Sequence, residues 1–304
     1  MIVAGIDCGT NSIRLLIVER DEAGQVREID RRMTIVRLGE GVDATRRFSE
    51  AALERTFRAI DDFASAISAH EVSRIRFVAT SASRDVANRA EFEAGVKERL
   101  GVLPEVITGD EEAALSFAGA TSGLGPEVKG PFLVIDIGGG STEFVLGKKQ
   151  PDAARSVDMG CVRMTERHLV TDPPTAEEVA AASADVDGLL QQALADVPMA
   201  KAKTVIGLAG TVTTVAAMAL GLTKYDRHAI HGTELSADKV HRACERLLHM
   251  TRDQRSALPF MHPGRVDVIG AGALVLDRVM TALPQSTLRV SEHDILDGIC
   301  QSLF

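Results

Sequence analysis

The chain has no tryptophan and a single tyrosine, and aromatic residues make up 4% of its 304 residues. Proteins that bind unpaired nucleic-acid strands stack the bases on aromatic side chains, and this sequence offers few of them. The composition therefore predicts no nucleic-acid partner.

Paired cysteines are also missing. Cys8, Cys161, Cys244 and Cys300 are far apart, with no Cys-x-x-Cys and no Cys/His spacing typical of zinc sites. A reduced protein without structural zinc is expected. Cys8 lies in an apolar run, where packing is a more common role than nucleophilic attack. The eight histidines show no His-x-x-x-His spacing, and we assign them no metal.

No basic N-terminal segment followed by an apolar stretch precedes the first apolar run, and no apolar run approaches about 20 residues. These absences predict an unexported, cytoplasmic protein that does not enter a membrane.

One short signature occurs twice. Residues 6–17 read IDCGTNSIRLLI, and residues 135–146 read IDIGGGSTEFVL. Each copy has an apolar run that ends in Asp, a turn through Gly and an outgoing alternating run, which together predict a β-hairpin. The length of the chain favours two domains, and the two copies agree with that number.

A glycine turn of this kind can bind phosphate. Glycine permits a tight turn and a close approach of ligand to backbone, and successive N–H groups form a concave anion site. Two such turns facing each other would clamp a phosphate chain, although a single one is usually a plain hairpin loop. The expected phosphate-binding residues in the two turns are Thr10, Asn11, Ser12, Gly138, Gly139, Gly140, Ser141 and Thr142.

Charged residues occupy equivalent places in the two copies. Asp7 and Asp136 end buried strands, where a charge needs a partner. A cation held through water is one such partner, and capping of the turn backbone is the alternative. Arg14 in the first copy matches Glu143 in the second. Arg14 could neutralise a phosphoryl oxygen while Glu143 holds water or Mg²⁺, or the two could form a simple salt bridge.

Hydrophobic periodicity and capping signals predict an order of β-β-β-α-β-α-β-α in the first third of the chain. The expected strands cover residues 2–8, 12–19, 26–38, 74–80 and 105–107. Ser49 and Asn88 are expected to cap helices that run to about 70 and 100. After a turn-rich break at 123–131 the pattern restarts with strands at 132–137, 141–146 and 204–209, a capping box at Thr175, and a helix at about 263–283.

Two α/β halves that each open with a phosphate hairpin resemble the superfamily of actin, heat-shock ATPases and sugar kinases. The individual motifs resemble the exopolyphosphatase/guanosine pentaphosphate phosphatase (Ppx/GppA) family over essentially the whole chain. These motifs are DCGTNSIRL at 7–15, ATSASRD at 79–85, ITGDEEA at 107–113, DIGGGSTE at 136–143, MGCVR at 159–163, LAGT at 208–211 and VSE at 290–292. Thr10 stands where the family usually has Ser, which keeps the hydroxyl.

The resemblance implies an α/β fold of two actin-like (ribonuclease H-like) domains with an active-site cleft between them. We expect one domain at 1–125 with residues 287–304 returning to it, and a second at 126–286. The chain resembles the short, two-domain form of the family. It also implies a homodimer.

The resemblance assigns the general base to the second Glu of the 107–113 motif, Glu112. Glu111 should point elsewhere on the same helix, and the alternative for either residue is a plain helix-start acid. Glu143 is the second catalytic carboxylate, and the metal residues are Asp7, Asp136 and Glu143. Arg84 would contact the next phosphates of a chain, and Arg265 would face the cleft.

The function implied is a Mg²⁺-dependent exopolyphosphatase, with Mn²⁺ as a possible replacement. Guanosine pentaphosphate 5′-phosphohydrolysis is the first alternative, because both substrates share a terminal phosphoanhydride. A kinase or ATPase of the actin-like superfamily is a further alternative, against which a water-activating pair of glutamates argues. A guanosine tetraphosphate sensor without turnover is the non-enzymatic alternative.

Overall fold

The computed structural model describes residues 1–84 and 86–304, so Asp85, the last residue of the 79–85 motif, lies outside the description. The chain divides into two compact units. The first unit comprises Met1–Gly119 and Ile295–Phe304, and the second comprises Ala120–Asp294. The second domain was predicted at 126–286. The observed second unit begins earlier, at Ala120, and ends later, at Asp294.

The first unit contains a five-stranded sheet of order β3-β2-β1-β4-β5. Its strands are β1 (Ile2–Cys8), β2 (Ser12–Arg20), β3 (Val26–Ile35), β4 (Arg74–Ala79) and β5 (Glu105–Val106). The first three strands form an antiparallel meander, and β4 and β5 continue the sheet in parallel with β1.

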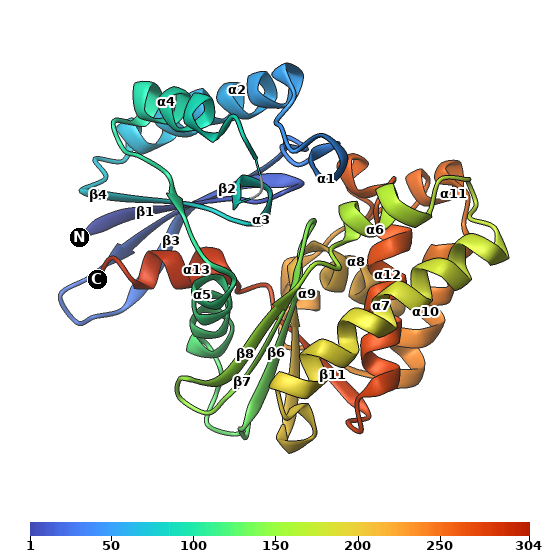
Figure 1. Ribbon diagram of the computed structural model, residues 1–304. Helices are drawn as coiled ribbons and strands as arrows, with labels where there is room; N and C mark the ends of the chain where they lie inside the picture. The colour runs from blue at the N-terminus through green and yellow to red at the C-terminus, as the bar shows by residue number, and fades with distance from the viewer. Residues whose placement is uncertain (85) are drawn as a thin grey trace. The chain divides into compact units, whose positions relative to one another are not determined.

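Helices cover both faces of this sheet (Figure 1). The helices with their bounds are α2 (Glu50–Ala69), α4 (Arg89–Leu100), α5 (Gly109–Ser122) and α13 (Ile295–Gln301). On one face, Ile6 and Phe77 pack with Phe63 of α2 and Phe92 of α4. On the other face, Val3 and Leu16 pack against residues of α13. Because alternate residues of a strand point to opposite faces, β1 and β2 contribute to both cores.

The second unit repeats this strand order and adds one edge strand. Its sheet has the order β10-β11-β9-β6-β7-β8. The strands are β6 (Phe132–Ile137), β7 (Thr142–Gly147), β8 (Pro151–Val157), β9 (Thr204–Leu208), β10 (Glu234–Ser236) and β11 (Thr287–Val290). An antiparallel meander of β6, β7 and β8 is followed by parallel β9 and β11, as in the first unit. Since β11 belongs to this sheet, the chain returns to the first unit only at Ile295.

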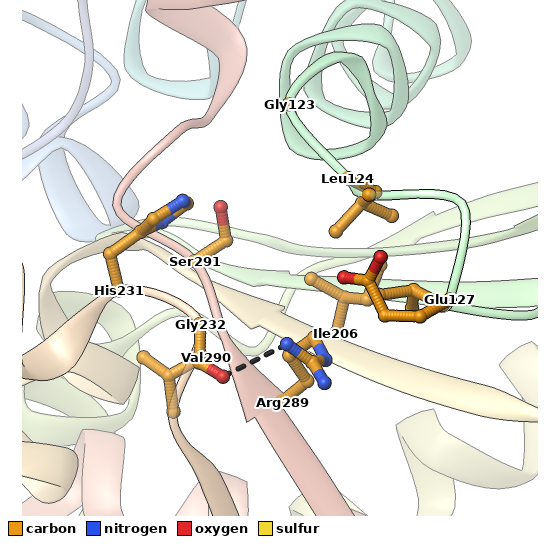
Figure 2. A pocket seen from close by; sticks show the side chains of 11 residues that line it. Gly123, Leu124, Glu127, Ile206, His231, Gly232, Arg289, Val290 and Ser291 are labelled. Atoms are coloured by element: carbon orange, nitrogen blue, oxygen red, sulfur yellow. Dashed lines mark hydrogen bonds between the residues drawn. The ribbon is translucent and has the colours of Figure 1, made fainter.

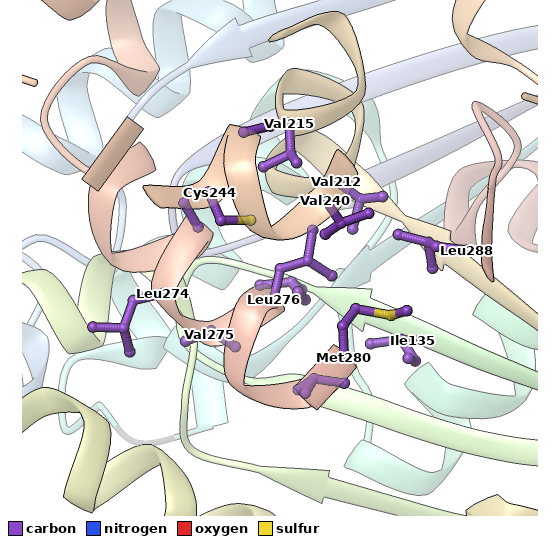
Figure 3. Close-up of a cluster of buried hydrophobic side chains, with 14 of the residues drawn as sticks. Ile135, Val212, Val215, Val240, Cys244, Leu274, Val275, Leu276, Met280 and Leu288 are labelled. Carbon is purple, nitrogen blue, oxygen red and sulfur yellow. The ribbon is translucent and has the colours of Figure 1, made fainter. Parts of the chain in front are cut away.

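One hydrophobic core joins this sheet to its helices (Figure 3). The helices are α6 (Cys161–His168), α7 (Ala176–Asp196), α8 (Ala209–Leu220), α10 (Ala237–His249) and α12 (Ile269–Ala282). Helix α12 is buried along most of its length, and Gly272 lets it approach Thr211 of α8 closely. The short helices are α1 (Val42–Thr45), α3 (Ser81–Arg84), α9 (Arg227–Ile230), α11 (Arg252–Ser256), η1 (Met199–Lys201) and η2 (Pro263–Arg265).

The capping predictions have mixed outcomes. Ser49 caps α2 by accepting from the N–H of Ala52, and Thr175 forms the predicted capping box with Glu178. Asn88 is the N-cap residue of α4, which ends at Leu100 as predicted, but its side chain accepts from the N–H of Phe48 and makes no capping bond to the helix.

Two predicted elements were too long. The strand predicted at 26–38 ends at Ile35, because the N–H groups of Val36 and Arg37 leave the sheet and bond to the carbonyl of Asn11. The helix predicted at 263–283 begins at Ile269, after the separate turn η2.

Within the part of the chain that the structure describes, no helix is both long and apolar enough to span a membrane. All four cysteines are buried and free. Burial, with a smaller contribution from Asp7, raises the pKa of Cys8 well above its usual value, which agrees with a packing role.

The packing of α13 in the first unit predicts that a larger residue at Gly298 destabilises the protein. A Cβ there would overlap the carbonyl group of Leu115 in α5, whereas a Cβ at Gly188 in α7 would meet nothing within 4 Å. We expect Gly298→Ala to lower the free energy of unfolding by about 1–3 kcal/mol through overpacking. Gly188→Ala should raise it by about 0.5–1 kcal/mol, because alanine favours the helix. Urea denaturation measures both, and equal effects at the two positions would contradict the packing described.

Candidate active site

The first glycine turn joins β1 to β2 and is held from behind by backbone hydrogen bonds. The N–H of Gly9 donates to the carbonyl of Ser12 at 3.0 Å, which closes the turn. The carbonyl of Asn11 accepts from Val36 and Arg37, and the carbonyl of Thr10 accepts from Gly39. The hydroxyl of Thr10 shares a buried hydrogen bond with Ser81 at 2.9 Å.

The second turn, between β6 and β7, is built in the same way. The N–H of Gly138 donates to the carbonyl of Ser141, again at 3.0 Å. The backbone N–H groups of residues 160–163, at the start of α6, donate hydrogen bonds to the carbonyls of Gly138, Gly139 and Gly140. The guanidinium of Arg163 adds a bond to the carbonyl of Gly140 at 2.8 Å.

These contacts occupy the carbonyl groups of both turns and leave N–H groups without partners. Among the described residues, no hydrogen bond is donated by the backbone N–H of Thr10, Asn11, Gly139 or Gly140. The buried side-chain oxygen Oδ1 of Asn11 has no partner there either. Neighbouring N–H groups that point away from their own carbonyls form an anion-binding site. Each unit therefore carries one turn with this arrangement of N–H groups.

A glycine lies against each turn and allows the neighbouring segment to approach the turn closely. A Cβ on Gly39 would overlap the side chain of Thr10, and a Cβ on Gly160 would overlap the backbone of Gly139 and Gly140. Both turns are thus held by hydrogen bonds from a neighbouring segment. In the first turn this segment follows β3, and in the second it is the start of α6.

The charged residues of the first hairpin bind each other. Asp7 and Arg14 are directly opposed across β1 and β2. The guanidinium of Arg14 donates to Oδ2 of Asp7 through Nε at 3.0 Å and Nη2 at 2.6 Å. Arg14 therefore offsets the charge of Asp7.

The second hairpin instead opposes two carboxylates. Asp136 and Glu143 are paired across β6 and β7, and they are 6% and 1% exposed. Side chains of directly opposed residues have Cβ atoms about 4.5–5.5 Å apart, and like charges there repel. Ser156 of β8 donates to Oε1 of Glu143 at 2.7 Å. Two buried carboxylates with a neighbouring hydroxyl are the oxygen donor set that a divalent cation such as Mg²⁺ prefers.

The two adjacent glutamates at the start of α5 point to different partners. Glu112 is 8% exposed, and its Oε2 accepts from Arg84 at 2.8 Å. Glu111 is half-exposed and pairs with Arg76, which also binds Glu105. Successive residues of a helix are about 100° apart, which accounts for this separation. Arg84 also donates to the carbonyl of Ile107, so it holds Glu112 in place rather than extending as an isolated charge.

Arg265, at the end of η2, lies over the first turn of α8. Its guanidinium donates to the carbonyl of Gly210 and the hydroxyl of Thr214, and a Cβ at Gly210 would overlap it. Gly210 thus makes room for this arginine. Burial and then the charge of Arg265 lower the pKa of His262. Burial raises the pKa of Cys161, and the nearby Arg265 is one of the influences that oppose this shift.

Tyr225, the single tyrosine, belongs to the same group of side chains. Its hydroxyl donates to Glu292 at 2.6 Å, and Arg227 donates to the other oxygen of that carboxylate. Burial, together with the negative charge of Glu292, raises the pKa of Tyr225 to about 12.

The sequence pattern of the Ppx/GppA phosphatase family matches residues 17–303. The chain belongs to this family. It is similar to exopolyphosphatase 2 of Mycobacterium tuberculosis, with 50% identity over 313 residues that cover 99% of this chain and 98% of that protein.

Among solved structures of Ppx/GppA proteins, the fold is close to that of an exopolyphosphatase-like protein, with a TM-score of 0.95, 44% identity and full coverage of both chains. It is also similar to the Ppx/GppA family member of Aquifex aeolicus, with a TM-score of 0.83 and 30% identity over 100% of this chain and 98% of that one. These likenesses confirm the predicted α/β fold of two actin-like domains.

Sequence reasoning missed the residues that support the site. Gly160 lies inside the MGCVR motif of the Ppx/GppA family. The motif identified this segment, but it did not predict that the segment donates hydrogen bonds to the second turn. Gly39 and Ser156 lie outside every recognised motif, and their roles follow only from the folded chain.

Gly160→Ala should disturb the second turn without straining its own backbone. Gly160 has φ −83° and ψ 161°, which alanine adopts readily, so the effect comes from overlap with Gly139 and Gly140. We expect kcat/KM for a phosphoanhydride substrate to fall by about 10–100-fold, since small displacements of positioning groups have effects of this size. Steady-state kinetics beside Gly188→Ala provides the measurement, and wild-type activity of a folded Gly160→Ala variant would disprove the support role.

Proposed function

We propose that this Ppx/GppA protein is an exopolyphosphatase that releases terminal orthophosphate from inorganic polyphosphate by attack of water. The observation that carries the proposal is the pair of glycine turns whose carbonyls are bonded from behind and whose N–H groups are left for an anion. The 50% identity to a mycobacterial protein named exopolyphosphatase 2 supports the same assignment.

The proposed chemistry needs a bound phosphate chain, an attacking water and a group that accepts the water's proton. We assign phosphate binding to residues 10–12 and 138–142, chiefly through the N–H groups of Thr10, Asn11, Gly139 and Gly140, because the N–H of Gly138 already donates to Ser141. Arg14, held by Asp7, and Arg265 would offset further phosphate charge.

Glu112 is the proposed general base. Its carboxylate is buried and oriented by Arg84. As water attacks the terminal phosphorus, Glu112 would accept its proton while the bridging P–O bond breaks. The shortened chain leaves with the electron pair of that bond, and orthophosphate is the second product. Arg84 would act through Glu112, although it was predicted to contact the distal phosphates directly.

Members of this enzyme class use a divalent metal, and we propose Mg²⁺, with Mn²⁺ able to replace it. Asp136 and Glu143 would hold the ion, because they are opposed, buried carboxylates. Asp7 fits this role less well, since Arg14 already offsets its charge. When bound, the cation would supply positive charge to the phosphoryl oxygens.

Phosphate release from polyphosphate of defined lengths, guanosine pentaphosphate and ATP, measured in parallel with Mg²⁺, tests the substrate. We expect stepwise orthophosphate release from the ends of polyphosphate. Scission inside the chain would contradict the proposal. Far faster turnover of guanosine pentaphosphate than of every polyphosphate length would favour guanosine pentaphosphate phosphohydrolysis instead.

Glu112→Gln should lower kcat by about 10²–10⁴-fold, the usual range for a general base, with little change in KM. Glu111→Gln is the matched control, because its side chain pairs with Arg76 on another side of the same helix. It should remain close to wild type. An inactive Glu111→Gln beside an active Glu112→Gln would reverse the assignment.

Glu143→Gln should change the metal requirement more than Glu112→Gln does. We expect the Mg²⁺ concentration for half-maximal activity to rise by about 10–100-fold, because one of two carboxylate ligands is lost. Asp152→Asn, an exposed acid on β8, serves as the control. An unchanged Mg²⁺ requirement in Glu143→Gln would remove this residue from the metal site.

The predicted homodimer and the predicted cytoplasmic location stay predictions. Light scattering across the micromolar range would test the first, with a mass near 32.5 kDa contradicting it.

A further inference from the structure

A second group of metal-ligating side chains lies outside the candidate active site, where α10 meets α12. His241 and Glu245 come from α10, and Asp277 comes from α12. One candidate ligand atom from each residue lies within 4.8 Å of the others. Nδ1 of His241 and Oδ1 of Asp277 are 2.8 Å apart.

The helices fix this arrangement. Residues four apart share one face of a helix, so His241 and Glu245 project together from α10. On the buried side of the same helices, Val240 and Cys244 pack into the core with Leu276 of α12 (Figure 3). Because the positions next to the three ligands are buried in this core, their backbones are held in register.

The local charge favours a cation. Two carboxylates face one imidazole, and Asp238 on the same helix adds negative charge near His241. Arg278, next to Asp277 in sequence, directs two hydrogen bonds to Asp187 instead, at 2.8 and 2.6 Å. His249 approaches Glu245 at 3.6 Å from the following turn of α10.

We propose that His241, Glu245 and Asp277 form a binding site for a first-row divalent metal ion, with Zn²⁺ as the best match. Imidazole nitrogen and carboxylate oxygen are common Zn²⁺ ligands. Tetrahedral Zn²⁺ at about 2.0–2.1 Å from each ligand places ligand atoms about 3.3 Å apart. The separation of 2.8 Å between His241 and Asp277 is shorter than this value and none of the three exceeds 4.8 Å, so a small rotation of the exposed His241 side chain brings the ligand atoms toward this geometry.

Space for the remaining coordination position is available beside these ligands. A cavity of about 110 Å³ is lined by Glu245, Asp277, Cys244 and Arg278, with other residues of α7 and α12. A water molecule occupies about 30 Å³ in the liquid, so one metal-bound water fits. The ion would link α10 to α12, and it would therefore stabilise the second unit without entering the proposed phosphatase chemistry.

Thermal unfolding of the chelator-treated full chain, with and without Zn²⁺, tests the site. Wild type should show a saturable rise in Tm, because a ligand that binds only the folded state stabilises it. Isothermal titration should give a corresponding binding event. His241→Ala and Asp277→Asn should each lose this Zn²⁺-dependent rise, measured against the same variant without metal. His228→Ala, which removes an exposed histidine from the same unit, should keep it.

Glu143→Gln separates this site from the proposed catalytic metal site. It should retain the Zn²⁺-dependent rise in Tm even if its phosphatase activity is lost, so failure of one proposal is distinguishable from failure of the other. The absence of any Zn²⁺-dependent rise in wild type would overturn the site. A rise that His241→Ala and Asp277→Asn leave intact would overturn it too, since the ion would then bind elsewhere.

Discussion

The candidate active site depends on the hydrogen bonds that occupy the carbonyl groups of the two glycine turns. Each backbone peptide group carries both a donor and an acceptor, and a buried acceptor needs a partner. The segment at Val36–Gly39 binds the carbonyls of the first turn, and the start of α6 binds those of the second. Because the neighbouring segments bind these carbonyls, the remaining N–H groups of the turns present a positive surface to an anion. Gly39 and Gly160 are the residues that let the supports come this close.

The two copies share a scaffold but differ in charge. The same register opposes Asp7 to Arg14 in one hairpin and Asp136 to Glu143 in the other. The first pair joins opposite charges, whereas the second consists of two buried carboxylates.

Local signals in the sequence predicted much of the fold. The strand at Ile2–Cys8 and the cap at Ser49 followed from periodicity and side-chain chemistry, which act over a few residues. Contacts between segments that are far apart in the sequence could not be predicted in this way. The side chain of Asn88 binds the N–H of Phe48 although Asn88 stands at the start of α4. The third strand ends early because the carbonyl of Asn11 accepts from the next two N–H groups. The motifs named Glu112 and Glu143, but Arg84 and Ser156 became their partners only through folding.

Nuclear magnetic resonance of the backbone amides during a titration with orthophosphate is the most direct test of the central claim. The account predicts saturable shifts at the N–H groups of Thr10, Asn11, Gly139 and Gly140, because these donors have no partner among the described residues. The amides of Gly9 and Gly138 already donate within the turns and should change less. Saturable binding of orthophosphate that leaves all four N–H resonances unchanged would contradict the account.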